Sequence, residues 1–136
     1  VMFGLNYRHN FKHIVRAAME GVIYRLYWVY EIISRALEKP PELIASGGYT
    51  RSPVWLQIQA DVFGREISLS GVEEASALGA AFLAMIATGR RGGIAERLPV
   101  MQKSATVVPR EEYGEMYRNT CKFALELYTE LTPASL

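Results

Sequence analysis

Apolar residues recur every three or four positions between residues 10 and 38, which is the spacing of one face of an α-helix. These positions are Phe11, Val15, Ala18, Val22, Leu26, Val29, Ile33 and Leu37. Asn10 is a suitable N-cap, because its side-chain oxygen can accept a hydrogen bond from a first-turn amide, and the Pro40-Pro41 pair cannot continue a helix. Four aromatic residues add bulk around the same helix: Tyr24, Tyr27, Trp28 and Tyr30. We therefore predict a helix over residues 10–38 that is central to the fold and buried on more than one side.

The segment after the prolines predicts a buried strand, a tight turn and a second helix. Residues 42–45 are short and largely apolar, and a glycine pair follows almost at once. Ser52 and Pro53 are a natural N-cap and first-turn residue. The apolar face of the helix that they open consists of Trp55, Ile58 and Val62. Gly64 is placed to end this helix.

A second strand and a third helix are predicted next. Ile67 and Leu69 alternate with polar residues, as in a strand. The segment from Ser70 to Glu73 has capping-box spacing and precedes a helix that ends at Gly89. Residues 74–81 are nearly all small, so we expect another helix or a sheet to approach this helix closely.

The end of the chain predicts a surface segment and a last helix. Residues 92–108 show no sustained hydrophobic period. After Pro109, one face of a helix is expected to point inward, and it consists of Tyr113, Met116, Tyr117, Thr120, Ala124, Leu127 and Leu131. The order helix, strand, helix, strand, helix implies parallel strands joined by right-handed crossovers. The expected fold class is therefore α/β, with few strands in view.

Composition narrows the classes of partner. The chain has 136 residues, half of them hydrophobic, which fits one domain with a hydrophobic core. Its 15 basic and 14 acidic residues give a net charge of +1, so no nucleic acid and no membrane surface is expected as a partner. No apolar stretch approaches the roughly 20 residues that cross a bilayer. Cys121 is the only cysteine, which is typical of a reduced, cytoplasmic protein.

The chemically informative stretch is the turn from Ser46 to Pro53, between the end of a strand and the start of a helix. Ligands of open α/β sheets bind at this edge. Gly47 and Gly48 have no Cβ, so a flat ring could lie directly against the backbone, and the next helix offers free amides as donors. The same glycines could equally form a tight connection that binds nothing. Their spacing fits neither the dinucleotide fingerprint nor the P-loop.

Two motifs together resemble the carboxyl-terminal domain of the FGGY carbohydrate kinases. They are S-G-G-Y-T-R-S-P-V-W-L-Q-I-Q-A-D-V-F-G, which begins at Ser46, and E-A-S-A-L-G-A-A, which begins at Glu74. Three flanking segments, F-G-L-N-Y-R-H, R-A-A-M-E-G-V and V-V-P-R-E-E-Y, are similar to family segments in the right order. The resemblance covers nearly the whole chain, and within the family it is strongest to gluconate kinases and then to xylulose kinases.

The resemblance implies an actin-like ATPase fold of the ribonuclease H-like type. Residues 1–136 would form the carboxyl-terminal nucleotide-binding domain, as a helix-rich partial copy of that fold from a longer chain. In the family, this domain and an amino-terminal kinase domain enclose ATP and the sugar between them. The implied reaction transfers the γ-phosphoryl group of ATP to a hydroxyl of a sugar or sugar acid, with gluconate expected. Mg²⁺ would be held largely by the phosphates and the other domain.

Site residues follow from the family motif position by position. Gly47 and Gly48 would give backbone contacts to the adenosine, Tyr49 would line the adenine pocket, and Ser52 would lie near the base or the ribose. A smaller residue, often alanine, is usual in the family where Tyr49 stands. Its ring could therefore stack on adenine or turn into solvent.

Other polar residues are expected to be structural. Asp61, the only aspartate, lies inside the predicted second helix, where a hydrogen-bonding role is expected. His9 and His13 lack a third ligand for a metal, and Arg16 and Glu20 are spaced to pair along a helix.

The resemblance implies that the family's catalytic base and D-x-G-T phosphate loop lie upstream. No catalytic residue and no turnover are therefore expected of this chain alone. A non-catalytic actin-like interaction module, which binds a partner through the aromatic helix, is the alternative. A subunit contact through that helix also leaves a homodimer open.

Overall fold

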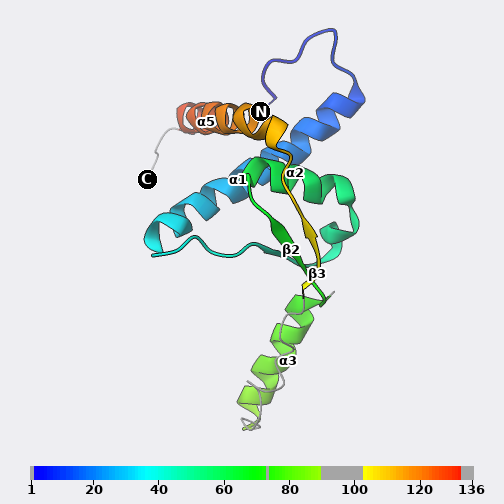
Figure 1. The fold of residues 1–136 in the computed structure, drawn as a ribbon, viewed down its shortest axis with the longest axis vertical. Helices are drawn as coiled ribbons and strands as arrows, with labels where there is room; N and C mark the ends of the chain where they lie inside the picture. Colours follow the sequence, from blue (N-terminus) through cyan, green and yellow to red (C-terminus); the bar gives the residue numbers. More distant parts are fainter. Residues whose placement is uncertain (1, 73, 90–102, 133–136) are drawn as a thin grey trace.

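The computed structural model of the chain describes residues 2–72, 74–89 and 103–132. Figure 1 shows the arrangement of its helices and strands. In chain order, the elements are α1 (Phe11–Ala36), β1 (Ile44–Ala45), the 3-10 helix η1 (Gly48–Arg51), α2 (Pro53–Phe63), β2 (Ile67–Ser70), α3 (Ala75–Ala87), β3 (Lys103–Val107), the 3-10 helix η2 (Glu111–Tyr113) and α5 (Gly114–Leu131).

The predicted start of the first helix and both predicted ends of the second helix are confirmed, whereas α1 ends at Ala36, two residues before the predicted end. The Asn10 side chain accepts hydrogen bonds from the amides of Lys12 and His13, and His13 Nδ1 accepts from the Asn10 amide in return. Ser52 caps α2, because its hydroxyl oxygen accepts from the Trp55 amide at 3.4 Å. Gly64 ends α2 in the left-handed conformation, with φ of 60°, which favours glycine.

The third helix begins differently from the prediction. Its N-cap is Glu74, whose side chain makes no capping hydrogen bond. The Ser70 hydroxyl instead accepts from the Val72 amide, at 3.1 Å, and so stabilises the turn after β2. The predicted partner, Glu73, lies outside the described residues.

The sheet has the order β1-β2-β3. The predicted parallel pairing of the first two strands is confirmed, with Ile44 opposite Ser68. The prediction of parallel strands alone is wrong, because β3 pairs with β2 in the antiparallel sense. This strand lies within the segment expected to be a surface loop, and its residues are mostly exposed. A mostly exposed strand has no apolar alternation that would identify it in the sequence. Such a strand is recognised only by its pairing with a neighbouring strand, which the local sequence does not show.

The core is built around α2, which contacts α1, α5 and the sheet. One cluster joins the three helices, and its buried members are Ile23, Tyr24, Ile58, Val62, Phe63, Tyr117 and Cys121. A second cluster joins α2 to the first two strands, and its buried members are Ala45, Leu56, Ala60 and Ile67.

 Among the helices of the described chain, α2 has the most buried residues. The first helix, predicted to be central, packs against α2 and α5 but has only two buried residues, Ile23 and Tyr24.

The apolar stripe predicted to bury α1 is exposed instead. Val22, Val29 and Ile33 keep 50%, 54% and 48% of their surface exposed. The residues of α1 that are buried are Ile23 and Tyr24, which face α2 and α5. Tyr27, Trp28 and Tyr30 are partly buried against the same cluster, so the predicted packing of these aromatic residues is confirmed. Because α1 is apolar on several faces, the apolar periodicity predicts that a helix forms but does not predict which face of it packs against α2.

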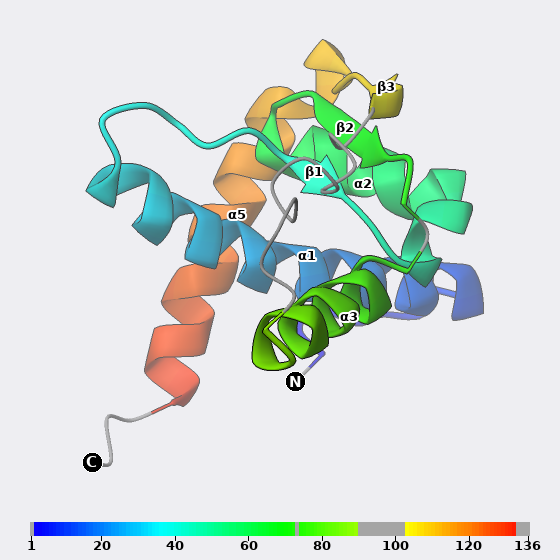
Figure 2. The same ribbon diagram turned by 90° about the horizontal axis from the view of Figure 1, so that it is seen from below.

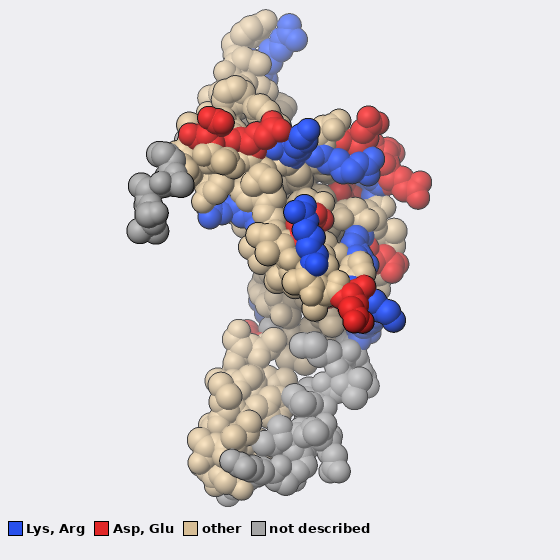
Figure 3. Space-filling model, turned by 90° about the vertical axis from the view of Figure 1, so that its left-hand side faces the viewer, with Lys and Arg blue, Asp and Glu red and all other residues tan. Residues whose placement is uncertain are grey.

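The third helix projects away from the rest of the described chain, beyond the end of β2 (Figure 1). None of its residues is buried, and Leu83 is 69% exposed. The predicted close packing of its small residues is therefore wrong for the described chain. The helix carries no charged residue, and Figure 3 shows the charged side chains gathered on the other part of the molecule.

The last helix lies across α1 in both ribbon views (Figures 1 and 2). Tyr117 and Cys121 are its buried residues. Of the residues predicted to face inward, Met116 and Leu131 are instead 48% and 52% exposed, because they lie at or beyond the edges of the contact with α1 and α2. Within the described ranges, no helix is long and apolar enough to cross a lipid bilayer.

Candidate functional site

The glycine turn lies between the end of β1 and the start of α2. Gly47 has φ of 94° and ψ of −179°, a combination that essentially only glycine adopts. The Thr50 amide and hydroxyl both donate to the Gly47 carbonyl, at 3.1 and 2.7 Å. The backbone of the turn is therefore closed by its own hydrogen bonds.

Gly48 differs from its neighbour, because its φ is not positive. A Cβ added at Gly48 would meet no atom of the described residues within 4 Å. The first hydrogen bond of η1 is donated by Thr50, so the amides of Gly48 and Tyr49 have no partner within this short helix. The turn thus presents an open surface with backbone donors beside it.

Tyr49 follows the glycines and is 36% exposed. Burial raises the pKa of its hydroxyl, and a hydrogen bond from the Gln59 side chain acts in the opposite direction without cancelling that effect. The ring is therefore neither free in solvent nor part of the core. Gln59 was not among the residues expected at the site from the sequence.

Ser52 completes the turn as the N-cap of α2. Its amide donates to the Tyr49 carbonyl at 3.0 Å, while its hydroxyl oxygen accepts from Trp55. Among the described residues, no group accepts the hydroxyl proton of Ser52, so this proton can be donated to a ligand. The structure thus brings all four predicted residues, Gly47, Gly48, Tyr49 and Ser52, into one continuous turn.

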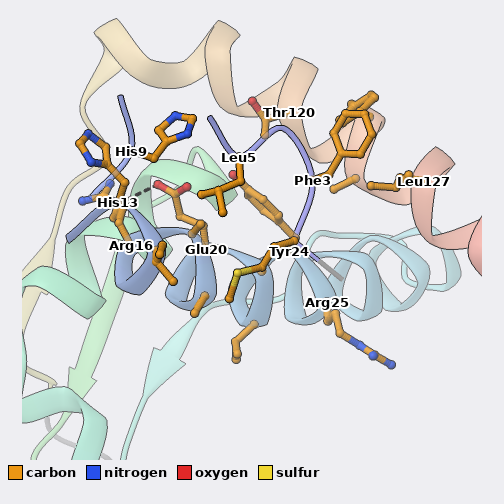
Figure 4. Close-up of a pocket in the computed structure, with 18 residues that line it drawn as sticks. Phe3, Leu5, His9, His13, Arg16, Glu20, Tyr24, Arg25, Thr120 and Leu127 are labelled. Atoms are coloured by element: carbon orange, nitrogen blue, oxygen red, sulfur yellow. Dashed lines mark hydrogen bonds and ion pairs between the residues drawn. The ribbon is translucent and has the colours of Figure 1, made fainter. Parts of the chain in front are cut away.

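A second concave feature was not predicted from the sequence. It is a groove of about 750 Å³ between α1, α5 and the segment before α1. Figure 4 shows Phe3 and Leu5 on one side of the groove, with Leu127 on the other. Phe3 contacts Phe123 of α5, with ring centroids 5.5 Å apart. Most of the lining is apolar. Four polar residues, His9, His13, Arg16 and Glu20, lie together at one end, while Arg25 lies toward the other end.

The polar end of the groove is occupied by hydrogen bonds within the protein. Arg16 Nε donates to Glu20 Oε1 at 2.7 Å, as the helical spacing predicted. Tyr117 Oη donates to the same oxygen at 2.8 Å and accepts from Arg16 Nη2 at 2.7 Å. Burial and the bond to Glu20 raise the pKa of Tyr117 to about 12. These three residues tie α1 to α5. The inward position of Tyr117 was predicted and is confirmed, whereas its bonds to Arg16 and Glu20 were not predicted.

The two histidines near this groove also make local contacts. His9 Nδ1 accepts from the Asn6 amide at 3.0 Å, and His13 Nδ1 accepts from the Asn10 amide at 3.2 Å. Among the described residues, no group of three or more His, Cys, Asp or Glu side chains could hold a metal ion. His9 therefore stabilises the turn before α1, and His13 stabilises the start of α1.

Asp61 has the structural role expected of it. Its side chain is fully buried and accepts from Arg110 N at 2.8 Å, Arg110 Nη2 at 2.6 Å and Gln57 Nε2 at 2.9 Å. Burial by itself raises the pKa of Asp61, but the hydrogen bonds from Arg110 and Gln57 outweigh this effect and lower it. The carboxylate holds the segment after β3 against α2.

Comparisons with known proteins identify relatives of the whole described fold. The model of the FGGY family of carbohydrate kinases, C-terminal domain, matches residues 1–88. A gluconokinase of Bacillus licheniformis is 36% identical over 92% of this chain and 25% of its own length. Glycerol kinase 1 of Thermotoga maritima is 35% identical over 95% of this chain and 27% of its own. Xylulose kinases are also among the relatives.

Solved structures show the same similarity. Gluconate kinase from Lactobacillus acidophilus matches with a TM-score of 0.78 and 25% identity, over 98% of this chain and 27% of that one. The chain therefore spans about a quarter of the length of the curated relatives and solved structures that it matches. The match of the family model to more than half of the residues, and the relatives above 30% identity, show that this chain belongs to the FGGY family of carbohydrate kinases.

Proposed function

We propose that this chain is the nucleotide-binding part of an ATP-dependent carbohydrate kinase and that its glycine turn holds the adenosine of ATP. The observation that carries this proposal is Gly48. Its backbone conformation does not require glycine, and a side chain there would meet nothing in the described chain. A glycine with no conformational or packing reason is explained if a ligand lies against the backbone at that point.

The turn offers suitable partners for an adenosine. The base would lie on Gly48, with Tyr49 as a neighbouring wall. The free amides at the start of η1 and the Ser52 hydroxyl would donate to acceptors on the base or the ribose. Gly47 would supply the backbone shape rather than a contact, since its positive φ sets the direction of the turn.

We further propose that the whole protein transfers the γ-phosphoryl group of ATP to a hydroxyl of a sugar or sugar acid. Gluconate is the proposed acceptor, which the 36% identity to a gluconokinase supports. A glycerol kinase is almost as similar, at 35% identity. The identity of the acceptor is therefore the part of the proposal that the comparisons restrict least. The described residues hold no cluster suited to Mg²⁺, so the ion would be bound by the phosphates and by other parts of the kinase.

The exposed apolar surfaces support a further part of this proposal. The stripe on α1 and most residues of α3 are exposed in the described chain, and exposed apolar surfaces of this kind usually meet another domain or protein. We propose that an amino-terminal kinase domain covers them and supplies the catalytic base. The complete domain would then have the actin-like, ribonuclease H-like fold. The lone, buried thiol of Cys121 is compatible with a cytoplasmic location.

The test is a titration of the ¹⁵N-labelled chain with ATP. We expect shifts of the amide signals of Gly47, Gly48 and Ser52 at millimolar ATP. Inorganic tripolyphosphate, which has the phosphates but no adenosine, is the control and should leave these signals in place. No shift with ATP, or equal shifts with tripolyphosphate, would contradict the proposed site.

A second candidate is a non-catalytic interaction module. The exposed stripe of α1 favours it, because such a surface could bind another protein or a second copy of this chain. Size-exclusion chromatography with light scattering detects self-association. Association together with no response to ATP would favour the module over the kinase.

A further inference from the structure

The peptide group that joins Gly47 to Gly48 is held by two hydrogen bonds. Its carbonyl oxygen accepts from the Thr50 amide at 3.1 Å and from the Thr50 hydroxyl at 2.7 Å. The first bond belongs to the backbone of η1 and needs no particular side chain at position 50. The second and shorter bond needs a hydroxyl beside the backbone, so the Thr50 side chain adds a contact of its own to this peptide.

A peptide group between two glycines has few other restraints on its orientation. It can turn by a coupled change of ψ at the first residue and φ at the second, and both residues here lack the Cβ that restricts these torsions. Gly47 has φ of 94° and ψ of −179°, whereas the φ of Gly48 is not positive. The orientation of this peptide therefore depends on the hydrogen bonds to its carbonyl oxygen.

The orientation of this peptide decides which of its polar groups faces a ligand on the glycine turn. The described residues have no cis peptide bond, and in a planar trans peptide the N–H and C=O bonds point in opposite directions. Because the Gly47 carbonyl is directed at Thr50, the Gly48 amide is directed away from Thr50. A turned peptide would exchange the two groups and present a carbonyl oxygen where the donor now lies.

We propose that Thr50 is a positioning residue, which holds the Gly47–Gly48 peptide in the orientation that binds adenosine. This inference rests on the proposed function of the glycine turn. The β-branched side chain of Thr50 has few χ1 rotamers, so little freedom is lost when its hydroxyl is held. A turn that already has its binding shape loses less conformational entropy with the ligand than a mobile turn does. Thr50 acts through the backbone and need not touch the nucleotide itself.

The test compares the ATP affinities of variants at position 50, measured by calorimetry. Thr50→Val keeps the branched shape of the side chain and removes the hydroxyl. Without the hydroxyl bond, turned peptides compete with the binding orientation, so ATP binding should weaken by about two- to tenfold, the range expected for one hydrogen bond. Thr50→Ser keeps the hydroxyl and should bind ATP within about twofold of the unaltered chain.

Thr129→Val is the matched control. The Thr129 hydroxyl also donates to a backbone carbonyl, that of Leu125 at 2.9 Å, but it lies on α5 and not in the glycine turn. This variant loses the same kind of bond and should bind ATP like the unaltered chain.

Unchanged affinity in Thr50→Val would overturn the role of Thr50. A loss of affinity in Thr50→Ser or in the control as large as that in Thr50→Val would overturn it as well, because the hydroxyl in the turn would then not be the cause. If Thr50→Val does not fold, Thr50→Ala removes the same hydroxyl, and the same outcomes decide.

The same measurements separate this inference from the proposed function. If the unaltered chain binds ATP and Thr50→Val binds it equally well, the adenosine site stands and the positioning role of Thr50 fails. If the unaltered chain does not bind ATP at all, both fail.

Discussion

Replacing Asp61 by asparagine tests how the chain is held together. The change keeps the size of the side chain and one acceptor for the Arg110 amide. It replaces Oδ2, which accepts from Arg110 Nη2 at 2.6 Å and from Arg110 Nε at 3.1 Å. An amide in this position would point donors at donors. The carboxyl side chain is fully buried, whereas that of Arg110 is 42% exposed.

The magnitude follows from that difference in exposure. Removing one partner of a buried ion pair costs about 3–5 kcal/mol when the remaining charge stays buried. Here the remaining charge belongs to the guanidinium, which water can reach, so we expect a smaller loss of about 2–3 kcal/mol. This is a large share of the roughly 5–15 kcal/mol that stabilises a typical domain.

Urea unfolding followed by far-UV circular dichroism measures this loss. Glu31→Gln is the matched control, because the Glu31–Arg35 pair is exposed and 3.5 Å apart, and such pairs contribute at most about 1 kcal/mol. If Asp61→Asn were as stable as the control, the hydrogen bonds of Asp61 would not hold the fold in the way described.

Three further predictions use the same assay. Because hydrogen bonds lower the pKa of Asp61, its contribution to the free energy of unfolding should be complete above about pH 5 and lost as pH falls below about 4. Asp61→Asn should lose less stability over this pH range than the unaltered chain. An equal loss in both proteins would contradict this role of Asp61. Tyr117→Phe should cost about 1–2 kcal/mol, since it leaves Glu20 and Arg16 without a shared partner, and a neutral result would count against this contact. Gly64→Ala should lower the free energy of unfolding by about 1 kcal/mol, because Gly64 has φ of 60°. Gly21→Ala, where the new Cβ meets open space, should instead stabilise α1 by about 0.5–1 kcal/mol. Equal effects of the two substitutions would refute the role given to the backbone conformation of Gly64.

The sequence predicted features that depend on a few neighbouring residues. The caps at Asn10 and Ser52, and the helix end at Gly64, are hydrogen bonds or backbone conformations within one turn of chain. Such chemistry is visible in the local pattern. The parallel pairing of β1 and β2 also followed from the order of elements.

Features that depend on distant partners were missed. Arg16 contacts Tyr117 across 101 positions, and Asp61 contacts Arg110 across 49. Contacts between residues so far apart in the sequence leave no pattern in the local sequence of either residue. The same holds for β3, which becomes a strand by pairing with β2, and for the face of α1 that packs against α2.

The candidate site was predicted in part. The spacing of the glycines was equally compatible with a ligand site and with a simple connection between a strand and a helix. The resemblance to the family motif favoured the ligand site.

The most direct test of the adenosine site is the ATP affinity of Gly48→Ala. The added Cβ meets no described atom within 4 Å, so the free energy of unfolding should stay within about 0.5 kcal/mol of the unaltered chain. The same Cβ would occupy the surface on which the base is proposed to lie, and ATP binding, measured by calorimetry, should weaken by about tenfold or more. Unchanged ATP affinity in a stably folded Gly48→Ala variant would contradict the account.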